Sequence, residues 1–274
     1  MDSKKREYHM TPEELRAVQM IELELLCEVD RICRKCGITY RIVAGTLLGA
    51  VRHGGFIPWD DDADVAFLRE EYDQFRSACE IELDTSRYYF QDHRNTPGYR
   101  WGYGKLRRKE TEFVRLNQEH MPYEQGIFID LFPYDYVPDN LPLRQVHCLK
   151  CFCYRKIFWS KIGAFNSKGL KKFVYLLLSK IPAGKVYRRY ERFIKRSNKR
   201  MSKWIRILTF PTPTCDHGYK SEWAEEVSEY IFEGYSFFGP KLYDEYMRYK
   251  YGDYMIIPPE NNRKTHPISK LKLY

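Results

Sequence analysis

The feature that most constrains this chain is a run of aspartates that leads from a Pro-Trp corner into an apolar segment. Residues 56–67 read Phe-Ile-Pro-Trp-Asp-Asp-Asp-Ala-Asp-Val-Ala-Phe. The pattern predicts a β-strand, on which side chains two residues apart point to the same face. Asp62 and Asp64 are therefore expected to project together, about 7 Å apart, with Asp60 at the same parity. An exposed loop or a helix cap is the ordinary explanation of an acidic run alone, but the apolar residues on both sides favour a buried site.

A third carboxylate, Asp130, lies inside the apolar run Gly-Ile-Phe-Ile-Asp-Leu-Phe of residues 126–132. A charge in an apolar strand is costly unless it is paired or binds a metal. Carboxylates that cluster also repel one another unless a cation lies between them, and hard oxygen ligands suit Mg²⁺ or Mn²⁺. The sequence therefore predicts a divalent-metal site made of Asp62, Asp64 and Asp130. Upstream, the Gly45-Thr46 turn before a short helix is typical of backbone that holds a phosphate.

The order of elements predicts an α+β fold. Thr11-Pro12-Glu13-Glu14 is typical of a helix start, and Gly37 of a helix end. Further helices are expected at 47–52, 70–83, 143–162, 169–181, 183–208 and 240–251. Strands are expected at 38–43, 56–67 (entered through the Pro58-Trp59 corner), 88–91, 99–107, 112–116 and 126–132. We expect a mixed β-sheet core with flanking helices over residues 1–140. A C-terminal helical region over residues 141–274 is expected to pack on this core as one compact unit.

Positive charge is concentrated in one segment. The chain carries a net charge of +9, and residues 168–206 contain fourteen Lys and Arg but one acid, Glu191. Spacings of three and four residues predict an amphipathic helix with a basic stripe. A solvated outer face explains such a stripe equally well, and the functional alternative is contact of residues 183–207 with anionic lipid headgroups or a phosphate-bearing polymer. No nucleic-acid partner is expected, because no recognised nucleic-acid motif is present.

The location expected from the sequence is cytoplasmic, with peripheral contact at the inner face of the membrane as an option. No apolar run approaches the roughly 20 residues of a membrane-spanning helix. The N-terminus lacks the apolar stretch of a secretory signal.

Residues 45–65, Gly-Thr-Leu-Leu-Gly-Ala-Val-Arg-His-Gly-Gly-Phe-Ile-Pro-Trp-Asp-Asp-Asp-Ala-Asp-Val, resemble the signature of the LicD family, which also includes the fukutin-related enzymes. The segment Tyr251–Met255 with Pro258-Pro259, Arg263 and His266-Pro267 is similar to that family's closing motif. The resemblance spans roughly residues 35–270. It implies a nucleotidyltransferase-type fold, in which Gly45 and Thr46 form the phosphate turn, Asp62 and Asp64 the Asp-x-Asp pair, and Asp130 the third carboxylate.

The resemblance also implies an activity. Family members move phosphocholine, or a phospho-alditol such as ribitol phosphate, from a CDP-linked donor to a sugar hydroxyl. The expected function is a metal-dependent phosphotransferase acting on a cell-surface glycan, lipid-linked glycan or teichoic-acid-type precursor, with release of CMP. Two alternatives remain: a nucleotidyltransferase that releases pyrophosphate, and a non-catalytic basic protein that binds membrane or polymer.

Site residues follow from this reading. Asp62, Asp64 and Asp130 are expected to bind Mg²⁺ or Mn²⁺ and to be catalytic, with Asp62 or Asp130 accepting the hydroxyl proton. The residues expected to bind substrate or nucleotide are Gly45, Thr46, Arg52, Asp60, Lys105, Arg107, Arg263 and His266. Trp59 and Trp101 are candidates for holding a quaternary ammonium by cation–π attraction.

Overall fold

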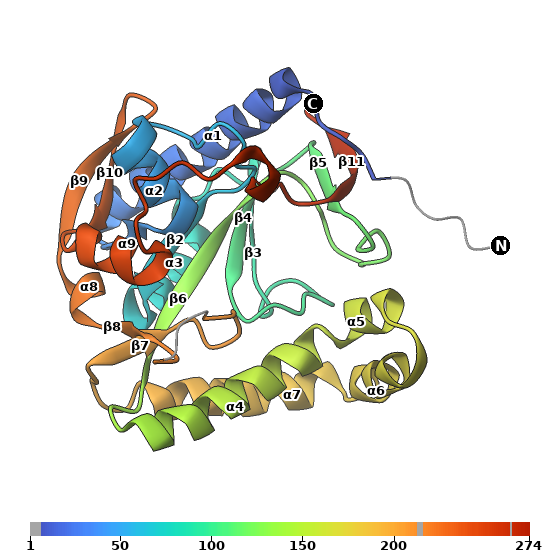
Figure 1. Ribbon diagram of the computed structural model, residues 1–274. Helices are drawn as coiled ribbons and strands as arrows, with labels where there is room; N and C mark the ends of the chain where they lie inside the picture. The colour runs from blue at the N-terminus through green and yellow to red at the C-terminus, as the bar shows by residue number, and fades with distance from the viewer. Residues whose placement is uncertain (1–6, 213–215, 264) are drawn as a thin grey trace.

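A mixed β-sheet in the order β1-β2-β6-β4-β3 runs through the centre of the molecule (Figure 1). The computed structural model describes residues 7–212, 216–263 and 265–274. Strands β2 and β6 are parallel, and the other neighbours in this order are antiparallel. The α+β class expected from the sequence is confirmed.

Within the described residues the helices are α1 (Pro12–Cys36), α2 (Ala44–His53), α3 (Arg69–Glu82), α4 (Leu141–Phe158), α5 (Ser160–Asn166), α6 (Gly169–Ser179), α7 (Ala183–Ser197), α8 (Glu222–Glu225) and α9 (Tyr243–Tyr251), with a 3₁₀ turn at Glu260–Asn262. The strands are β1 (Arg41–Ile42), β2 (Asp64–Leu68), β3 (Tyr88–Gln91), β4 (Gly104–Arg108), β5 (Glu112–Arg115), β6 (Phe128–Val137), β7 (Trp204–Arg206), β8 (Tyr219–Lys220), β9 (Val227–Phe232), β10 (Tyr235–Pro240) and β11 (Ile268–Lys272).

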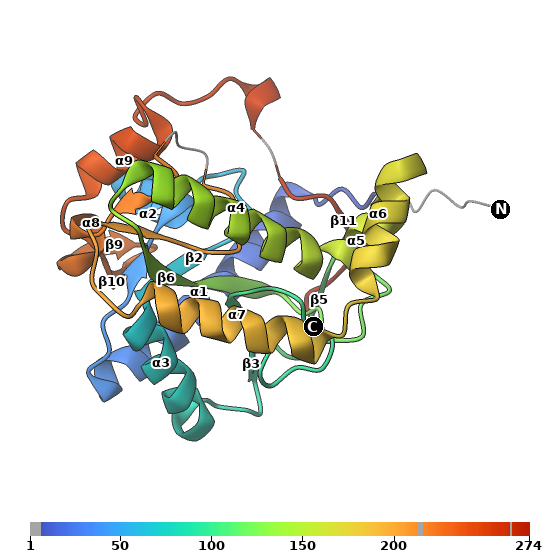
Figure 2. The same cartoon turned by 90° about the horizontal axis from the view of Figure 1, so that it is seen from below.

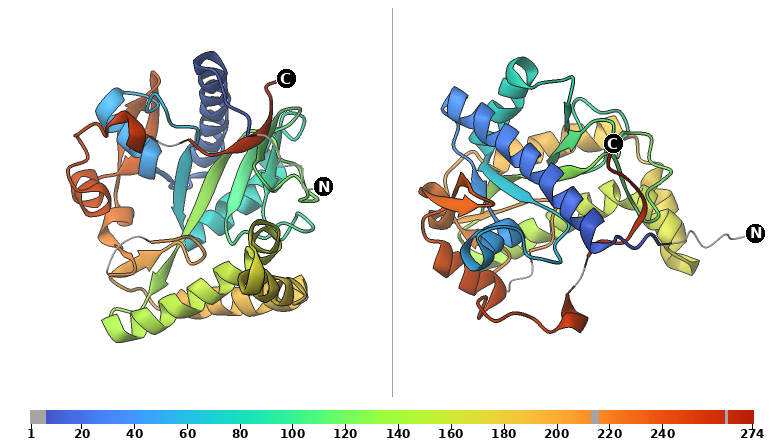
Figure 3. Two further views of the ribbon diagram at one scale, coloured as in Figure 1. Left: turned by 45° about the vertical axis from the view of Figure 1, so that its right-hand side comes forward. Right: turned by 90° about the horizontal axis from the view of Figure 1, so that it is seen from above.

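Helix α1 begins and ends where the sequence predicts. The Thr11 hydroxyl accepts a hydrogen bond from the Glu14 amide at 3.2 Å, and the Glu14 carboxylate accepts one from the Thr11 amide at 2.8 Å. Gly37 ends the helix in the left-handed conformation, at φ 66°. The buried side of α1 packs against α3, β4 and β6 (Figure 3), and its core residues include Val18, Ile21, Leu25, Val29 and Ile32.

The second half of the chain contains strands that the sequence did not predict. β7 pairs with the far end of β6 and β8 pairs with β7, while β9 and β10 form a hairpin. β11 pairs with β5, and so joins the C-terminal end to the first half of the chain. Helices α4 and α7 lie side by side at the end of the molecule opposite α1 (Figures 1 and 2). The division of the chain at residue 140 stays a prediction.

The helix predicted over 183–208 is wrong in extent, because α7 ends at Ser197. Asn198 follows it and docks on β6: its side chain accepts a hydrogen bond from the Tyr136 amide and donates one to Asp135. The chain then turns back, and Trp204–Arg206 pairs with residues 135–137 of β6. Several of the predicted basic residues therefore lie beyond the helix, in a loop and a strand.

Strand β2 is also shorter than predicted, because it begins at Asp64 and residues 60–63 approach it in an irregular conformation. The helix expected at 47–52 starts earlier, at Ala44, so that Gly45 and Thr46 belong to its first turn. Ala44 itself has a positive φ of 51°, a strained conformation for a residue with a side chain. This sharp entry places the start of α2 beside the acidic run.

Candidate active site

Three charged side chains lie at the same level of three neighbouring strands. Asp64 on β2 pairs in register with Asp130 on β6, and Lys105 on β4 pairs in register with Asp130 from the other side. Residues directly opposite on adjacent strands project from the same face of a sheet. The Lys105 ammonium donates a hydrogen bond to Asp130 Oδ1. The sheet thus supplies the partner that Asp130 needs inside an apolar strand.

Lys105 lies in an aromatic setting. Its Nζ is 3.4 Å from the centroid of the Phe128 ring and 5.7 Å from that of Tyr103, both within range of cation–π attraction. Burial lowers the pKa of Lys105 to about 8, although Asp130 acts in the opposite direction. Lys105 is therefore a cation fixed at the floor of the site.

The acidic run is held in place by groups behind it. Gln19 on α1 donates to the carbonyl oxygen of Asp60 at 3.0 Å. Gly45 leaves room for the Asp60 carboxylate, since a Cβ at residue 45 would lie 2.5 Å from Asp60 Oδ2. The Thr46 hydroxyl accepts a hydrogen bond from the Asp64 amide at 2.8 Å. Gly45 and Thr46 thus shape the entry to β2, and their role as a phosphate turn stays a prediction.

The carboxylates of the acidic run act on one another electrostatically. Burial, reinforced by the neighbouring aspartates, raises the pKa of Asp60 to about 8 and holds that of Asp64 well above its usual value. Burial also raises the pKa of Asp61 and of Asp62 to about 6, against the opposing effect of Arg115. Such a cluster favours the binding of positive charge.

A buried glutamate of α1 adds to this cluster. Glu22 is 2% exposed, and burial followed by the charges of Asp62, Asp61 and Asp60 raises its pKa well above the usual value. Its Oε2 has no hydrogen-bond partner among the described atoms. Glu22 was not predicted from the sequence, because a glutamate within an amphipathic helix is usually one of its solvent-exposed polar residues.

A cavity of about 320 Å³ opens over the three strands. Six of the predicted site residues line it: Asp62, Asp64, Lys105, Arg107, Asp130 and His266. Aromatic and apolar side chains form much of the remaining wall, including Trp101, Tyr103, Phe113, Tyr123, Phe128 and Phe210. The cavity therefore combines charged groups of both signs with a largely aromatic surround.

Arg107 is fixed by its own hydrogen bonds. It donates to Gln91 Oε1 and to the carbonyl oxygen of Gly126, each at 2.6 Å. Arg115 at the end of β5 also lines the cavity, with its guanidinium 5.5 Å from the Phe128 ring centroid. Sequence analysis did not select Arg115, which reaches the cavity because its strand pairs with β11, where Arg115 is opposite Ile268. Arg115 and Phe113 are two residues apart on β5 and therefore share a face. This spacing is the pattern in the sequence that could have identified Arg115.

The C-terminal segment closes against the acidic run. The His266 amide donates to Asp61 Oδ2 at 2.9 Å, and its ring Nδ1 lies 3.0 Å from Asp61 Oδ1 and 3.4 Å from Asp62 Oδ2. His266 thus lies beside Asp61 and Asp62, and its role in closing over a nucleotide stays a prediction.

Five of the residues predicted to bind metal, substrate or nucleotide lie outside the cavity lining: Gly45, Thr46 and Asp60, described above, and Arg52 and Arg263. Arg52 donates to the carbonyl oxygen of Tyr254 at 2.7 Å. The guanidinium of Arg263 lies 4.4 Å from the centroid of the Trp59 ring, and its Nε donates to the carbonyl oxygen of Pro258. Arg52 thus ties the segment after α9 to α2, and Arg263 ties it to Trp59 at the start of the acidic run. Contact of Arg52 with a donor diphosphate and of Arg263 with the nucleotide stay predictions.

The three predicted metal ligands have carboxylate side chains, which suit a divalent cation, but these side chains do not converge on one point. Among residues 7–212, 216–263 and 265–274, no three His, Cys, Asp or Glu side chains converge as a metal-binding group. Asp130 turns to Lys105 instead. The donor set of Asp62, Asp64 and Asp130 nevertheless offers the carboxylate oxygens that Mg²⁺ and Mn²⁺ prefer, on residues whose mutual repulsion a cation would relieve.

Sequence comparisons relate this chain to known proteins. Residues 37–155, which include β2, β4 and β6, match a family model described as LicD/FKTN/FKRP, nucleotidyltransferase domain. The chain is 28% identical over 280 residues to the lipopolysaccharide cholinephosphotransferase LicD of Haemophilus influenzae, across 93% of this chain and 97% of that protein. A shorter match, 43% identical over 53 residues, joins 19% of this chain to 17% of an uncharacterized protein of Rickettsia typhi.

Proposed function

The chain belongs to the LicD family and is a transferase, and we propose that it is a metal-dependent phosphotransferase that moves phosphocholine from a CDP-linked donor to a glycan hydroxyl. In this reaction a new phosphorus–oxygen bond forms to the acceptor, the bond from that phosphorus to CMP breaks, and the acceptor proton passes to a base. The similar protein of Haemophilus influenzae is named as a lipopolysaccharide cholinephosphotransferase, which supports phosphocholine as the group and a lipopolysaccharide-type glycan as the acceptor.

The observation that carries the proposal is the alignment of Asp64, Asp130 and Lys105 across three strands, under a cavity that Asp62 also lines. Phosphoryl transfer depends mainly on positioning and on neutralising the charge of the transferred group. Carboxylates that can hold a cation, placed next to fixed positive side chains, supply both requirements. Mg²⁺ or Mn²⁺ held by Asp62, Asp64 and Asp130 would supply a Lewis acid at the donor diphosphate.

The protein's own cations have distinct roles in this proposal. Arg115 faces the cavity from β5 and is the side chain best placed to bind the donor diphosphate. Lys105 and Arg107 are more firmly fixed, since each already binds a protein group. Lys105 and Arg107 give the floor of the cavity a positive potential, and their side chains need not change position during the reaction.

Of the two candidate bases, Asp62 is favoured. Asp130 already accepts a hydrogen bond from the Lys105 ammonium, so fewer of its lone pairs are open to an acceptor hydroxyl. The Asp62 side chain is 20% exposed, against 9% for Asp130, and is therefore the more accessible of the two to an acceptor hydroxyl. His266, 3.4 Å from Asp62, is placed to orient it.

The aromatic wall favours choline over an alditol. Trp101 and Tyr103 have ring centroids 6.1 Å apart, and Tyr103 and Phe210 are 6.0 Å apart. Such rings attract a quaternary ammonium through cation–π interactions and offer an alditol little hydrogen bonding. Trp59, the other predicted ring, is already covered by Arg263.

The test incubates the purified protein and Mg²⁺ with CDP-choline, CDP-ribitol or CDP-glycerol, where water can replace the acceptor hydroxyl, or with CTP, and measures CMP, phosphocholine and pyrophosphate. We expect CMP from CDP-choline, a fall of at least about 100-fold in Asp62→Asn, and no change in the matched control Asp73→Asn on α3, outside the cavity. Trp101→Ala should raise KM for CDP-choline without affecting CDP-glycerol. Unchanged CMP release from a folded Asp62→Asn would refute the role of the site. Release of pyrophosphate from CTP, or of phosphocholine in place of CMP from CDP-choline, would replace the proposal with nucleotidyl transfer.

A further inference from the structure

Helix α6 presents an apolar stripe to solvent. Leu170, Phe173, Val174 and Leu177 follow the i, i+3, i+4, i+7 spacing of one helix face and are 79%, 57%, 46% and 51% exposed. Tyr175 is the one residue of α6 that is buried. A stripe of this kind on the surface of a globular protein marks a contact with a partner or a membrane.

Helix α4 continues this apolar surface. Val146, Leu149 and Phe152, spaced three residues apart, are 55%, 63% and 46% exposed. α6 packs against both α5 and α4. Seen from below, α4, α6 and α7 lie together on one side of the molecule (Figure 2).

The same surface is strongly basic. Residues 141–212 contain nineteen Lys and Arg but a single acid, Glu191. A groove of about 600 Å³ between α4 and α7 has apolar side chains along it and a basic rim made of Lys150, Lys185, Arg189, Arg192 and Arg196. Lys171 and Lys172 are exposed next to the stripe on α6.

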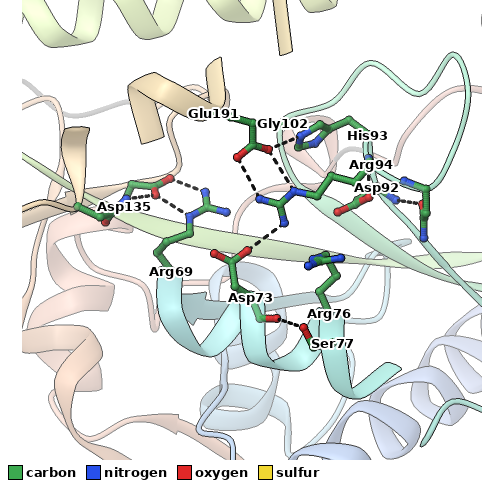
Figure 4. A network of polar contacts seen from close by, with 12 residues as sticks. Arg69, Asp73, Arg76, Ser77, Asp92, His93, Arg94, Gly102, Asp135 and Glu191 are labelled. Carbon is green, nitrogen blue, oxygen red and sulfur yellow. Dashed lines mark hydrogen bonds and ion pairs between the residues drawn. The ribbon is translucent and has the colours of Figure 1, made fainter. Parts of the chain in front are cut away.

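Glu191 does not neutralise this surface. Its carboxylate turns toward the loop after β3, where it lies 2.7 Å from His93 Nε2 and 3.1 Å from Arg94 Nε (Figure 4). The Glu191 carboxylate therefore points inward, whereas arginines of α7 line the groove.

We propose that α4, α6 and the basic side of α7 form a surface that docks on an anionic phospholipid bilayer. The stripe on α6 enters the boundary between headgroups and acyl chains, and the basic side chains lie at the level of the lipid phosphates. α6 has eleven residues, about half the length needed to cross a bilayer. None of the helices in the described ranges is long and apolar enough to span a membrane, so the contact is peripheral.

Charge decides between a bilayer and a second copy of this chain as the occupant. Two copies that met through this surface would bring like-charged residues together, which is unfavourable. An anionic bilayer offers both an apolar interior for the stripe and negative charge for the basic rim. This surface extends the one predicted over residues 183–207 by the apolar residues of α6 and α4, while helix α7 itself ends at Ser197.

The experiment is co-sedimentation of the full chain with vesicles of phosphatidylcholine alone or mixed with phosphatidylglycerol. We expect binding to the mixed vesicles only, weakened as salt rises above about 0.1 M. The double variant Phe173→Ser/Leu177→Ser should reduce the bound fraction about tenfold at limiting lipid. Arg189→Glu/Arg192→Glu should do the same and remove the salt dependence. Ile81→Ser, which changes an 83% exposed apolar residue on α3, is the matched control and should bind normally.

Binding that is equal for both kinds of vesicle, or that is unaffected by the α6 variant, would overturn the proposal. So would a dimer in the absence of lipid that Phe173→Ser abolishes, since a second copy would then be the occupant. CMP release from the soluble donor should be the same in the α6 variant and in the unmodified chain. Failure of membrane docking is therefore distinguishable from failure of the proposed enzymatic function.

Discussion

The buried ion pair between Arg69 and Asp135 offers the sharpest test of what holds the sheet and its helices together. Arg69 at the start of α3 donates from Nε and Nη2 to the two oxygens of Asp135 on β6, each at 2.7 Å (Figure 4). Asn198, just after α7, donates to the same carboxylate at 2.6 Å. Asp135 is fully buried and Arg69 is 8% exposed. One carboxylate therefore connects α3, β6 and the end of α7.

Asp135→Asn keeps the shape of the side chain but leaves the guanidinium of Arg69 buried without its counter-charge. Breaking a buried pair from one side costs about 3–5 kcal/mol, a large fraction of the 5–15 kcal/mol that stabilises a typical domain. Replacing both partners by apolar residues of similar size, as in Arg69→Met/Asp135→Leu, should recover most of this loss, because no charge is then left buried.

The measurement is urea unfolding followed by circular dichroism. The matched control is Glu80→Gln, which breaks the more exposed pair with Arg76 on α3 and should cost less than about 0.5 kcal/mol. A loss for Asp135→Asn as small as that of the control would refute the argument. So would a double variant that is less stable than the single one.

Two predictions concern pH. Burial raises the pKa values of Asp60, Asp61 and Asp62 to between about 6 and 8. Their full contribution to stability is therefore present below about pH 4 and is lost as the pH rises to between about 6 and 8. The midpoint of thermal unfolding in EDTA should therefore fall between pH 5 and pH 8, and Mg²⁺ should restore more of it at pH 8; an equal effect of Mg²⁺ at both pH values would contradict this. Burial alone would raise the pKa of Glu191, but hydrogen bonds from His93 and Arg94 lower it to about 2, so its contribution is present above about pH 4.5 and lost toward pH 2. Glu191→Gln should lower the free energy of unfolding by about 1 kcal/mol at pH 7 and by less at pH 3, and a loss that does not depend on pH would argue against the pairing.

The local features of this protein were predictable because their causes lie within a few residues. The capping box of Thr11 and Glu14 and the left-handed Gly37 fix the two ends of α1. The carboxylates of the acidic run and Asp130 stand out because charge within apolar sequence is costly. Three of them line one cavity because β2 and β6 are adjacent parallel strands. The residue pattern predicts both strands but does not show that they are neighbours.

What the sequence by itself determined is therefore the residue types of the candidate site and the two ends of α1, since both depend on residue types and short spacings. The tertiary structure alone decided that Lys105 pairs with Asp130, that Arg115 reaches the cavity through the β5–β11 pairing, and that α7 stops where Asn198 meets β6. The physical reason is that strand pairing and burial join residues far apart in the chain, and no local pattern records which of them will meet.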